Sequence, residues 1–142
     1  MAKKIELRVI APTTATTADP YKFNDSIDMV IMRCTTGDMG ILAGRVPISM
    51  VLGTGVLRII NEDSEKHLAI MGGVAHASDD IVTILSDSAL APNEIEVEKV
   101  QAELKELHQK YEEATDISEK NSYRDEMHRC QVLVDVASSE KK

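Results

Sequence analysis

The sequence is poor in aromatic residues and has no strongly basic segment. Phenylalanine, tyrosine and tryptophan make up 3% of the 142 residues, and tryptophan is absent. A surface on which bases or sugars stack therefore has little to be built from. The formal net charge is −8, whereas binding to nucleic-acid phosphates needs a dense basic patch. We therefore expect no nucleic-acid partner.

Cysteine is equally scarce, and apolar residues never form a long run. Cys34 and Cys130 lie far apart and match no metal-binding or redox spacing, so we expect reduced thiols, one in a strand and one on a helix face. No stretch of 18 apolar residues could cross a bilayer, and we expect no signal peptide because the first residues lack an apolar core. With 43% hydrophobic and 28% charged residues, the composition is typical of a soluble intracellular protein.

The residues of a catalytic or metal site are missing as well. The four histidines form no H-x-x-x-H pair, so no zinc site is expected. The glycine-rich residues 37–45 lack the Lys-Ser/Thr pair of a phosphate loop. In the segment G-T-G-V-L-R at residues 53–58, Arg58 stands where the third glycine of a dinucleotide-binding motif belongs. We interpret both segments as turns that need positive φ and expect no catalytic centre.

Up to residue 90, short apolar runs follow one another at close spacing. Residues 5–9 alternate between apolar and polar side chains, which is the pattern of a half-buried strand. Further runs lie at residues 27–34, 49–52, 56–60, 67–71, 74–77 and 81–85. A polar hairpin loop at 61–65 and a turn at Gly72-Gly73 separate some of them. Strands this close together, with no helix between them, predict an antiparallel sandwich or barrel.

Beyond residue 90 the apolar residues recur at steps of three and four. A first stripe consists of Val97, Val100, Leu104, Leu107, Tyr111 and Ala114. A second stripe consists of Tyr123, Met127, Cys130, Val134 and Ala137. Two stripes of matched length with a short break predict an antiparallel helical hairpin.

Capping signals mark the start of both predicted helices. Asn93 with Glu96 is the predicted N-cap pair of the first helix, and Asp116 with Glu119 is that of the second. Each apolar stripe is narrow and the remaining surface is densely charged. We therefore expect a weakly attached appendage rather than part of the core.

Two motifs resemble the epsilon subunits of F-type ATP synthases. The segment G-D-M-G-I-L-A-G-R-V-P at residues 37–47 is similar to the family's G-[ED]-x-G-I-x-x-G-[HR]-x-P. M-G-G-V at 71–74 and V-T-I-L-S-D-S-A at 82–89 resemble its G-G … V-x-[VI]-L-[AS]-D-x-A. The resemblance implies an N-terminal antiparallel β-sandwich at residues 1–90, followed by a C-terminal antiparallel helical hairpin at residues 91–142.

The resemblance also implies a function. It predicts a non-catalytic rotor subunit of the central stalk, which couples ATP synthesis or hydrolysis to proton or sodium transport. The sandwich would lie between the gamma subunit and the c-ring. The hairpin would fold onto the sandwich or extend along gamma towards the alpha and beta subunits and restrain ATP hydrolysis. Such a protein is peripheral at the cytoplasmic face of the membrane, which it contacts only through the complex.

Residue roles follow from the same resemblance. The family's contact loop for the c-ring and gamma is matched by Thr36, Gly37, Asp38, Met39 and Arg45. Its beta-subunit contacts on the second helix are matched by Lys120, Arg124 and Arg129. A frequent histidine of the family is replaced by arginine at position 45. Residues 91–142 carry 13 acidic and 8 basic side chains, so attraction to acidic loops of beta should be weak.

Some relatives bind ATP through an [IL]-D-x-x-R-A motif at the start of the hairpin. The aligned residues 95–100, I-E-V-E-K-V, keep Ile95 but place Glu96, Lys99 and Val100 at the other three positions. Glutamate is one methylene longer than aspartate, and lysine cannot reproduce the two-pronged contact of arginine. We therefore expect no cofactor, and ATP binding that is weak or absent.

Two alternatives from other classes deserve comparison. A free-standing ligand-binding β-sandwich could use its helical hairpin to pair two chains. Such a module has no need for the motif at residues 37–47 together with L-S-D-S-A at 85–89. A small hydrolase would need a nucleophile and a neighbouring base, and no such pair is visible.

Overall fold

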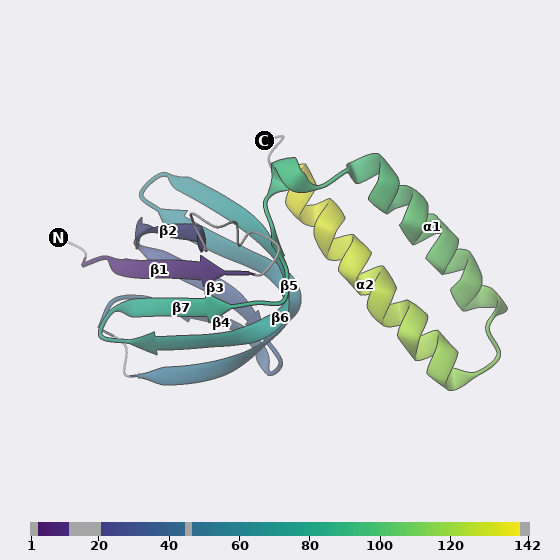
Figure 1. The fold of residues 1–142 in the computed structure, drawn as a ribbon, viewed down its shortest axis with the longest axis horizontal. Coiled ribbons are helices and arrows are strands. Elements are labelled where there is room, and N and C mark those ends of the chain that lie inside the picture. The colour runs from purple at the N-terminus through teal and green to yellow at the C-terminus, as the bar shows by residue number, and fades with distance from the viewer. Residues whose placement is uncertain (1–2, 12–20, 45–46, 140–142) are drawn as a thin grey trace. The chain divides into compact units, whose positions relative to one another are not determined.

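The computed structural model describes residues 3–11, 21–44 and 47–139, and it divides the chain into two compact units, Met1–Ala89 and Leu90–Lys142. The first unit is built from strands and the second from helices (Figure 1). Arg45, which the resemblance assigns to the contact loop, lies outside the described residues.

The described strands form one continuous sheet. They are β1 Ile5–Ile10, β2 Tyr21–Ile27, β3 Met29–Cys34, β4 Gly37–Ile41, β5 Ile48–Asn61, β6 Ser64–Ser78, β7 Ile81–Leu85 and β8 Ala89–Leu90. Their order across the sheet is β2-β1-β7-β6-β5-β3-β4, and β8 pairs with β6. Strands β1 and β7 run parallel, whereas the other pairs along this order are antiparallel.

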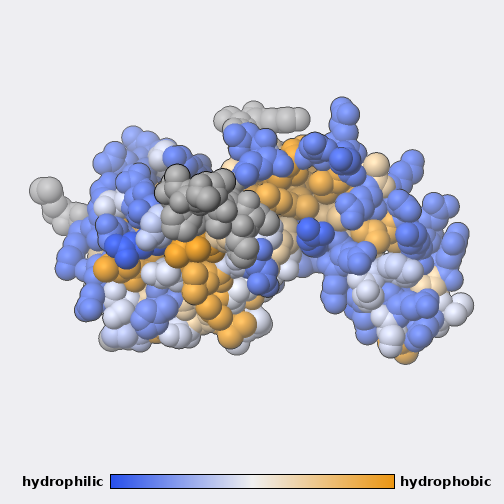
Figure 2. All heavy atoms as spheres, viewed as in Figure 1, coloured by the Kyte–Doolittle hydropathy of each residue, from blue (hydrophilic) through white to orange (hydrophobic). Residues whose placement is uncertain are grey.

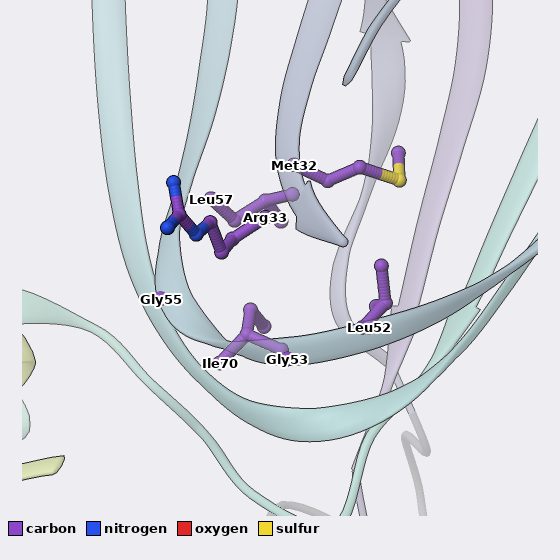
Figure 3. A pocket seen from close by; sticks show the side chains of 7 residues that line it. All are labelled: Met32, Arg33, Leu52, Gly53, Gly55, Leu57 and Ile70. Carbon is purple, nitrogen blue, oxygen red and sulfur yellow. The ribbon is translucent and has the colours of Figure 1, made fainter. Parts of the chain in front are cut away.

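The two long strands, β5 and β6, fold this sheet into the two layers of a sandwich. β7 pairs with the end of β6, whereas the start of β3 pairs with the opposite end of the β5–β6 ladder. Between these regions the β3–β5 register shifts, because Ile31 lies opposite Arg58 but Cys34 lies opposite Leu52. Figure 3 shows both long strands curving sharply near Gly55. The predicted β-sandwich is confirmed.

The interior of the sandwich follows the alternation seen in the sequence. Ile5, Leu7 and Val9 are no more than 1% exposed, whereas the residues between them are half-buried. The other strands contribute further side chains that are at most 2% exposed, among them Ile27, Val30, Met32, Ile41, Leu57, Ile59, Val82 and Ile84. The period-two prediction for residues 5–9 is therefore confirmed.

Two predicted turns, at residues 53–55 and at Gly72-Gly73, are wrong, and the predicted hairpin loop at 61–65 is present but shorter. Residues 49–52 and 56–60 belong to the single strand β5, and 67–71 and 74–77 belong to β6. Gly72 and Gly73 have φ of 78° and 124°, yet they bend β6 rather than end it. The predicted loop at 61–65 is a two-residue turn, because pairing of β5 with β6 continues to the last residue before it.

The second unit contains a short 3-10 helix, η2 Pro92–Glu94, and two α-helices, α1 Val97–Glu113 and α2 Ile117–Ser139. The first predicted stripe is confirmed, because its six residues are buried or half-buried while every other residue from 97 to 114 is exposed. In α2 the buried side chains are Cys130, Val132, Leu133, Val136 and Ala137. The buried face of the last turns of α2 is thus wider than the predicted stripe.

One of the two predicted caps is correct. The Asp116 carboxylate accepts a hydrogen bond from the Ser118 backbone N–H at 3.0 Å, which caps α2. The prediction for Asn93 is wrong, because this residue lies inside η2, and α1 starts only after Glu96. The Ala91 N–H donates to the Glu94 carboxylate at 2.9 Å and so completes the earlier, separate turn.

Candidate functional site

The predicted contact loop is a tight β-hairpin. Only Thr36 lies in the two-residue turn, where it is exposed, whereas Gly37, Asp38 and Met39 are the first residues of β4. Gly37 has φ of 128°, a conformation that favours glycine, and it lies opposite the last residue of β3. The prediction of one continuous turn over these four residues is therefore wrong. The turn is shorter than predicted because β3–β4 pairing continues up to Cys34 and Gly37, on either side of the two turn residues.

The charge of Asp38 is balanced within the hairpin. Arg33 lies opposite Asp38 in the β3–β4 register, and its Nη1 is 3.3 Å from the Asp38 Oδ1. Both side chains are more than half exposed, so the pair adds little to stability. Its effect is to present a nearly neutral surface beside the turn rather than an isolated negative charge.

The same arginine explains a glycine on the next strand. Figure 3 shows Arg33 beside Gly55 in a crevice lined by side chains of β3, β5 and β6. A Cβ on Gly55 would lie 2.5 Å from the Cβ of Arg33, so only glycine fits under this side chain. The crevice has no space for a water molecule. The predicted positive φ is absent at Gly53 and Gly55 but present at Gly44.

The second motif, L-S-D-S-A, has a structural role at the end of β7. The buried Ser86 hydroxyl lies 2.7 Å from the Gly72 carbonyl and 2.9 Å from the Ser88 carbonyl. A Cβ on Gly73 would lie 2.2 Å from the Leu85 carbonyl oxygen. The serine therefore ties the end of β7 to the bend of β6. Its hydroxyl donates to a main-chain carbonyl, which gives no sign of a nucleophile.

An exposed apolar row crosses the outer face of the layer formed by β1, β7, the end of β6 and the start of β5. Val51, Val74 and Leu85 lie opposite one another on β5, β6 and β7, and Ile10 of β1 continues the row. Val51 is 59% exposed, and Val74 and Leu85 are each 49% exposed. Figure 2 shows hydrophobic side chains in a strip across these strands. Apolar residues gathered on a surface in this way are typical of a protein–protein contact.

The adjacent row on this face is polar. It consists of Arg8, Ser49, His76 and Thr83, which lie opposite one another on the same four strands. The Ser49 Oγ and His76 Nδ1 lie 2.8 Å apart. The apolar row is therefore a bounded strip rather than a generally hydrophobic face.

On the hairpin, the structure brings two of the three predicted basic residues to one tyrosine. Lys120 Nζ lies 5.3 Å and Arg124 Cζ lies 5.9 Å from the centre of the Tyr111 ring. Arg124 Nη2 also donates to the Tyr111 hydroxyl oxygen at 3.3 Å, and this hydrogen bond lowers the pKa of Tyr111. The exposed Arg129 takes part in neither contact. The sequence predicted Tyr111 only as a residue of the apolar stripe, and its contacts with the two basic side chains were not predicted.

Three of the residues that align with the ATP-binding motif of some relatives lie around one shallow depression. Ile95, Glu96 and Lys99 line it, together with Glu94 and Glu103. The Lys99 Nζ is 3.2 Å from the Glu96 Oε2, and both side chains are more than 70% exposed. Three carboxylates beside a single ammonium group would repel phosphate groups.

Other site types find no support in the described ranges. There, no three side chains able to ligate a metal gather together, and no helix is long and apolar enough to cross a membrane. Cys34 and Cys130 are free and buried, on β3 and α2 as predicted.

Comparison with known proteins shows the family of this chain. The family model described as "ATP synthase, Delta/Epsilon chain, beta-sandwich domain" matches residues 7–92. The ATP synthase epsilon chain of Synechococcus sp. (strain WH7803) is 38% identical over 100 residues, which cover 70% of this chain and 69% of the relative. That of Caldicellulosiruptor saccharolyticus is 29% identical over 127 residues, which cover 89% and 88% of the two chains.

Solved structures give the same result. A chain of the Euglena gracilis mitochondrial ATP synthase (OSCP/F1/c-ring) has a TM-score of 0.70 and 26% identity, covering 89% of this chain and 79% of that one. A chain of the Tetrahymena thermophila mitochondrial ATP synthase (central stalk/c-ring) has a TM-score of 0.61 at 13% identity and shows the same fold. The chain therefore belongs to the ATP synthase epsilon-chain family, whose members are non-catalytic subunits of the central stalk.

Proposed function

We propose that this chain is a rotor subunit that couples ATP synthesis or hydrolysis to proton or sodium transport, with the sandwich as its docking unit and the hairpin as a regulatory element. The sandwich would bind the gamma subunit and the c-ring, and the hairpin would reach the alpha and beta subunits. The chain would lie at the cytoplasmic face of the membrane and touch the membrane only through the complex. The exposed apolar row on the sandwich carries this proposal.

The apolar row is the proposed gamma-binding surface. Next to this row on the same strands, Met50, Leu52, Ala75 and Ile84 are at most 9% exposed, whereas Val51, Val74 and Leu85 remain about half exposed after folding. Fully burying an aliphatic side chain of this size contributes about 1.5–3 kcal/mol, and because each of the three is already about half covered, a partner would gain roughly half of this at each position. The row would therefore contribute to a larger contact, and gamma is the stalk partner that the family resemblance implies.

The test is a pair of charge substitutions on one strand. Val51→Asp should abolish capture of the full chain by purified gamma, because it places a carboxylate in the middle of a dehydrated contact. Ser49→Asp is the matched control, since Ser49 lies two residues away on the same strand and the same face, in the polar row. Capture that survives Val51→Asp as well as it survives Ser49→Asp would refute this assignment.

The β3–β4 turn is the proposed c-ring contact. It is exposed, short and nearly neutral, because Asp38 is paired with Arg33. A cysteine replacing Thr36 should form disulfides with cysteines placed in the c-subunit loops of the assembled complex. Asp63→Cys, in the two-residue β5–β6 turn, is the control and should not cross-link. The native cysteines are buried and should not interfere.

The hairpin is the proposed regulatory element, and it should be a weak brake. Its excess of acidic side chains opposes docking near acidic loops of the beta subunit. Deleting residues 93–142 should leave assembly of the ATP synthase intact and change its ATP hydrolysis by no more than about several-fold, in keeping with a screened surface interaction. A release of hydrolysis by orders of magnitude would show that the brake is strong.

A further inference from the structure

A cluster of three side chains joins the two helices beside their connecting turn. Tyr111 lies in the last turn of α1, and Lys120 and Arg124 lie one turn apart near the start of α2. Both cations lie close to the tyrosine ring, and Arg124 also donates a hydrogen bond to its hydroxyl oxygen. Lys120 is half-buried, whereas its neighbours in sequence are exposed. The contacts therefore hold two long basic side chains against α1.

Neither cation is held in an ion pair within the described part of the chain, although the pKa of Arg124 is raised by its hydrogen bond to Tyr111 and, to a lesser degree, by the charge of Asp125. Among the residues that the structure describes, Lys120 and Arg124 form no ion pair, although Glu119 and Asp125 are their direct neighbours in sequence. Elsewhere on the hairpin, Lys99 pairs with Glu96 and Lys110 with Glu106. The positive charges of the cluster thus remain available to an acidic partner once the side chains leave the ring.

We propose that Tyr111 is an autoinhibitory clasp, which holds Lys120 and Arg124 on the hairpin and withholds them from an acidic surface of the ATP synthase. The proposal rests on the proposed regulatory function of the hairpin. The contacts with Tyr111 fix the positions of both side chains, so that reaching a carboxylate placed elsewhere on another subunit requires them to leave the ring. Closing the clasp therefore weakens the brake, and opening it strengthens the brake.

The contacts of Lys120 and Arg124 with Tyr111 are weak enough to be replaced by stronger ones. A cation over an aromatic ring at an exposed site shifts an equilibrium by about two- to five-fold. A hydrogen bond between a cation and a carboxylate is stronger. A partner surface with carboxylates at the right spacing can therefore displace the ring, whereas free solvent does not.

The apolar seam alone does not require tyrosine at this position. Residue 111 follows the buried Leu107 in the stripe that α1 packs inward, and leucine would continue this stripe. Only the aromatic face and the hydroxyl oxygen can hold the two cations. Tyr111→Leu therefore removes the clasp while keeping an apolar residue in the seam.

The test uses the assembled ATP synthase with the full-length chain. Tyr111→Leu should lower its ATP hydrolysis about three-fold or more, because two contacts of this kind are lost. Tyr111→Phe keeps the ring and should have a smaller effect in the same direction. Adding Lys120→Gln and Arg124→Gln to Tyr111→Leu should restore the wild-type rate. Circular dichroism of each chain should show unchanged helix content.

The outcomes separate this proposal from the function on which it rests. If deletion of residues 93–142 alters hydrolysis but Tyr111→Leu behaves as wild type or hydrolyses faster, the clasp is refuted and the regulatory function stands. If neither change alters hydrolysis, the clasp is refuted and the hairpin exerts no measurable brake. If Tyr111→Leu lowers hydrolysis but the added glutamines do not restore it, the cations are not the effectors and the clasp is again refuted.

Discussion

The sandwich and the hairpin bury their apolar residues in different ways. In the sandwich, side chains from both layers meet, and residues such as Leu7, Val30 and Ile84 are completely buried. In the hairpin, by contrast, Leu107 is the only buried residue of α1, and the buried side chains of α2 are confined to its last turns, from Cys130 onward. A packed interior determines one structure, whereas a narrow seam leaves alternatives close in free energy. The difference supports the proposal that the sandwich is the docking unit and the hairpin the regulatory element.

The difference also concerns charge. The exposed faces of the hairpin carry mostly isolated or locally paired charges, such as the exposed pair of Glu96 and Lys99. On the sandwich, Glu65 of β6 binds Arg58 across the β5–β6 ladder and also binds His67, two residues further along β6. Exposed single pairs contribute little, whereas small networks contribute more. Substitutions of charged residues should thus change stability more in the sandwich than in the hairpin.

The largest effect should come from the bend of β6. Gly73→Ala should destabilise the sandwich by about 3 kcal/mol or more, because φ of 124° is strained for alanine and its Cβ would collide with the Leu85 carbonyl. Gly40→Ala is the control, since its Cβ would meet nothing closer than 3.8 Å. Urea denaturation measures both. Equal stability of the two variants would contradict the account of the bend.

The next effect compares one leucine from each unit. Leu7→Ala should lower the free energy of unfolding of the sandwich by about 2–5 kcal/mol, because Leu7 is fully buried. Leu107→Ala should reduce the helical circular dichroism signal but leave the sandwich transition within about 1 kcal/mol of wild type. A single transition that shifts equally in both variants would show that the two units unfold together.

A smaller, pH-dependent effect should come from Glu65. Hydrogen bonds from Arg58 and His67 lower the pKa of Glu65 from 4.5 to about 2. Its contribution to stability is therefore present above pH 4.5 and is lost as the pH falls through about 2. After screening by solvent it should amount to about 0.5–1 kcal/mol. Glu65→Gln should show this loss at pH 7, and the difference from wild type should vanish near pH 2.

The smallest expected effect is the response to ATP. Isothermal titration of the full chain should show weak binding or none, because Glu94, Glu96 and Glu103 surround Lys99. Losing one or two contacts of the relatives' motif weakens binding by about 10- to 10⁴-fold. Restoring that motif with Glu96→Asp, Lys99→Arg and Val100→Ala should tighten binding. A low micromolar dissociation constant in the unmodified chain would contradict this prediction.

Local periodicity predicted those elements whose burial depends only on their own geometry. The alternation in β1 and the stripe of α1 were both correct, because each reports which side of one element is covered. The unbroken course of β5 was not predictable in this way. Its bend depends on Gly55 lying beneath Arg33, a residue of another strand. Strand β2 was missed because its polar residues suggest a loop until its pairing with β1 is known.

The same limit applies to the candidate sites. The motif residues were found from the sequence, and the free-standing dimerisation module lost its support once the family was shown. The pairing of Asp38 with Arg33 depends on strand register, and the Tyr111 contacts join residues 9 and 13 positions apart across two helices. Contacts of this kind depend on how separate elements pair or pack, so they cannot be predicted from the spacing of residues along the sequence.

Hydrogen–deuterium exchange of the full-length chain distinguishes a firmly folded sandwich from a hairpin that opens locally. Backbone amides of β1 and β7 should exchange only through global unfolding of the sandwich. Amides of α1 and α2 should exchange at least about 100-fold faster, through local opening of the hairpin. Equal protection of the helices and of the central strands would contradict the division into a fixed docking unit and an adjustable element.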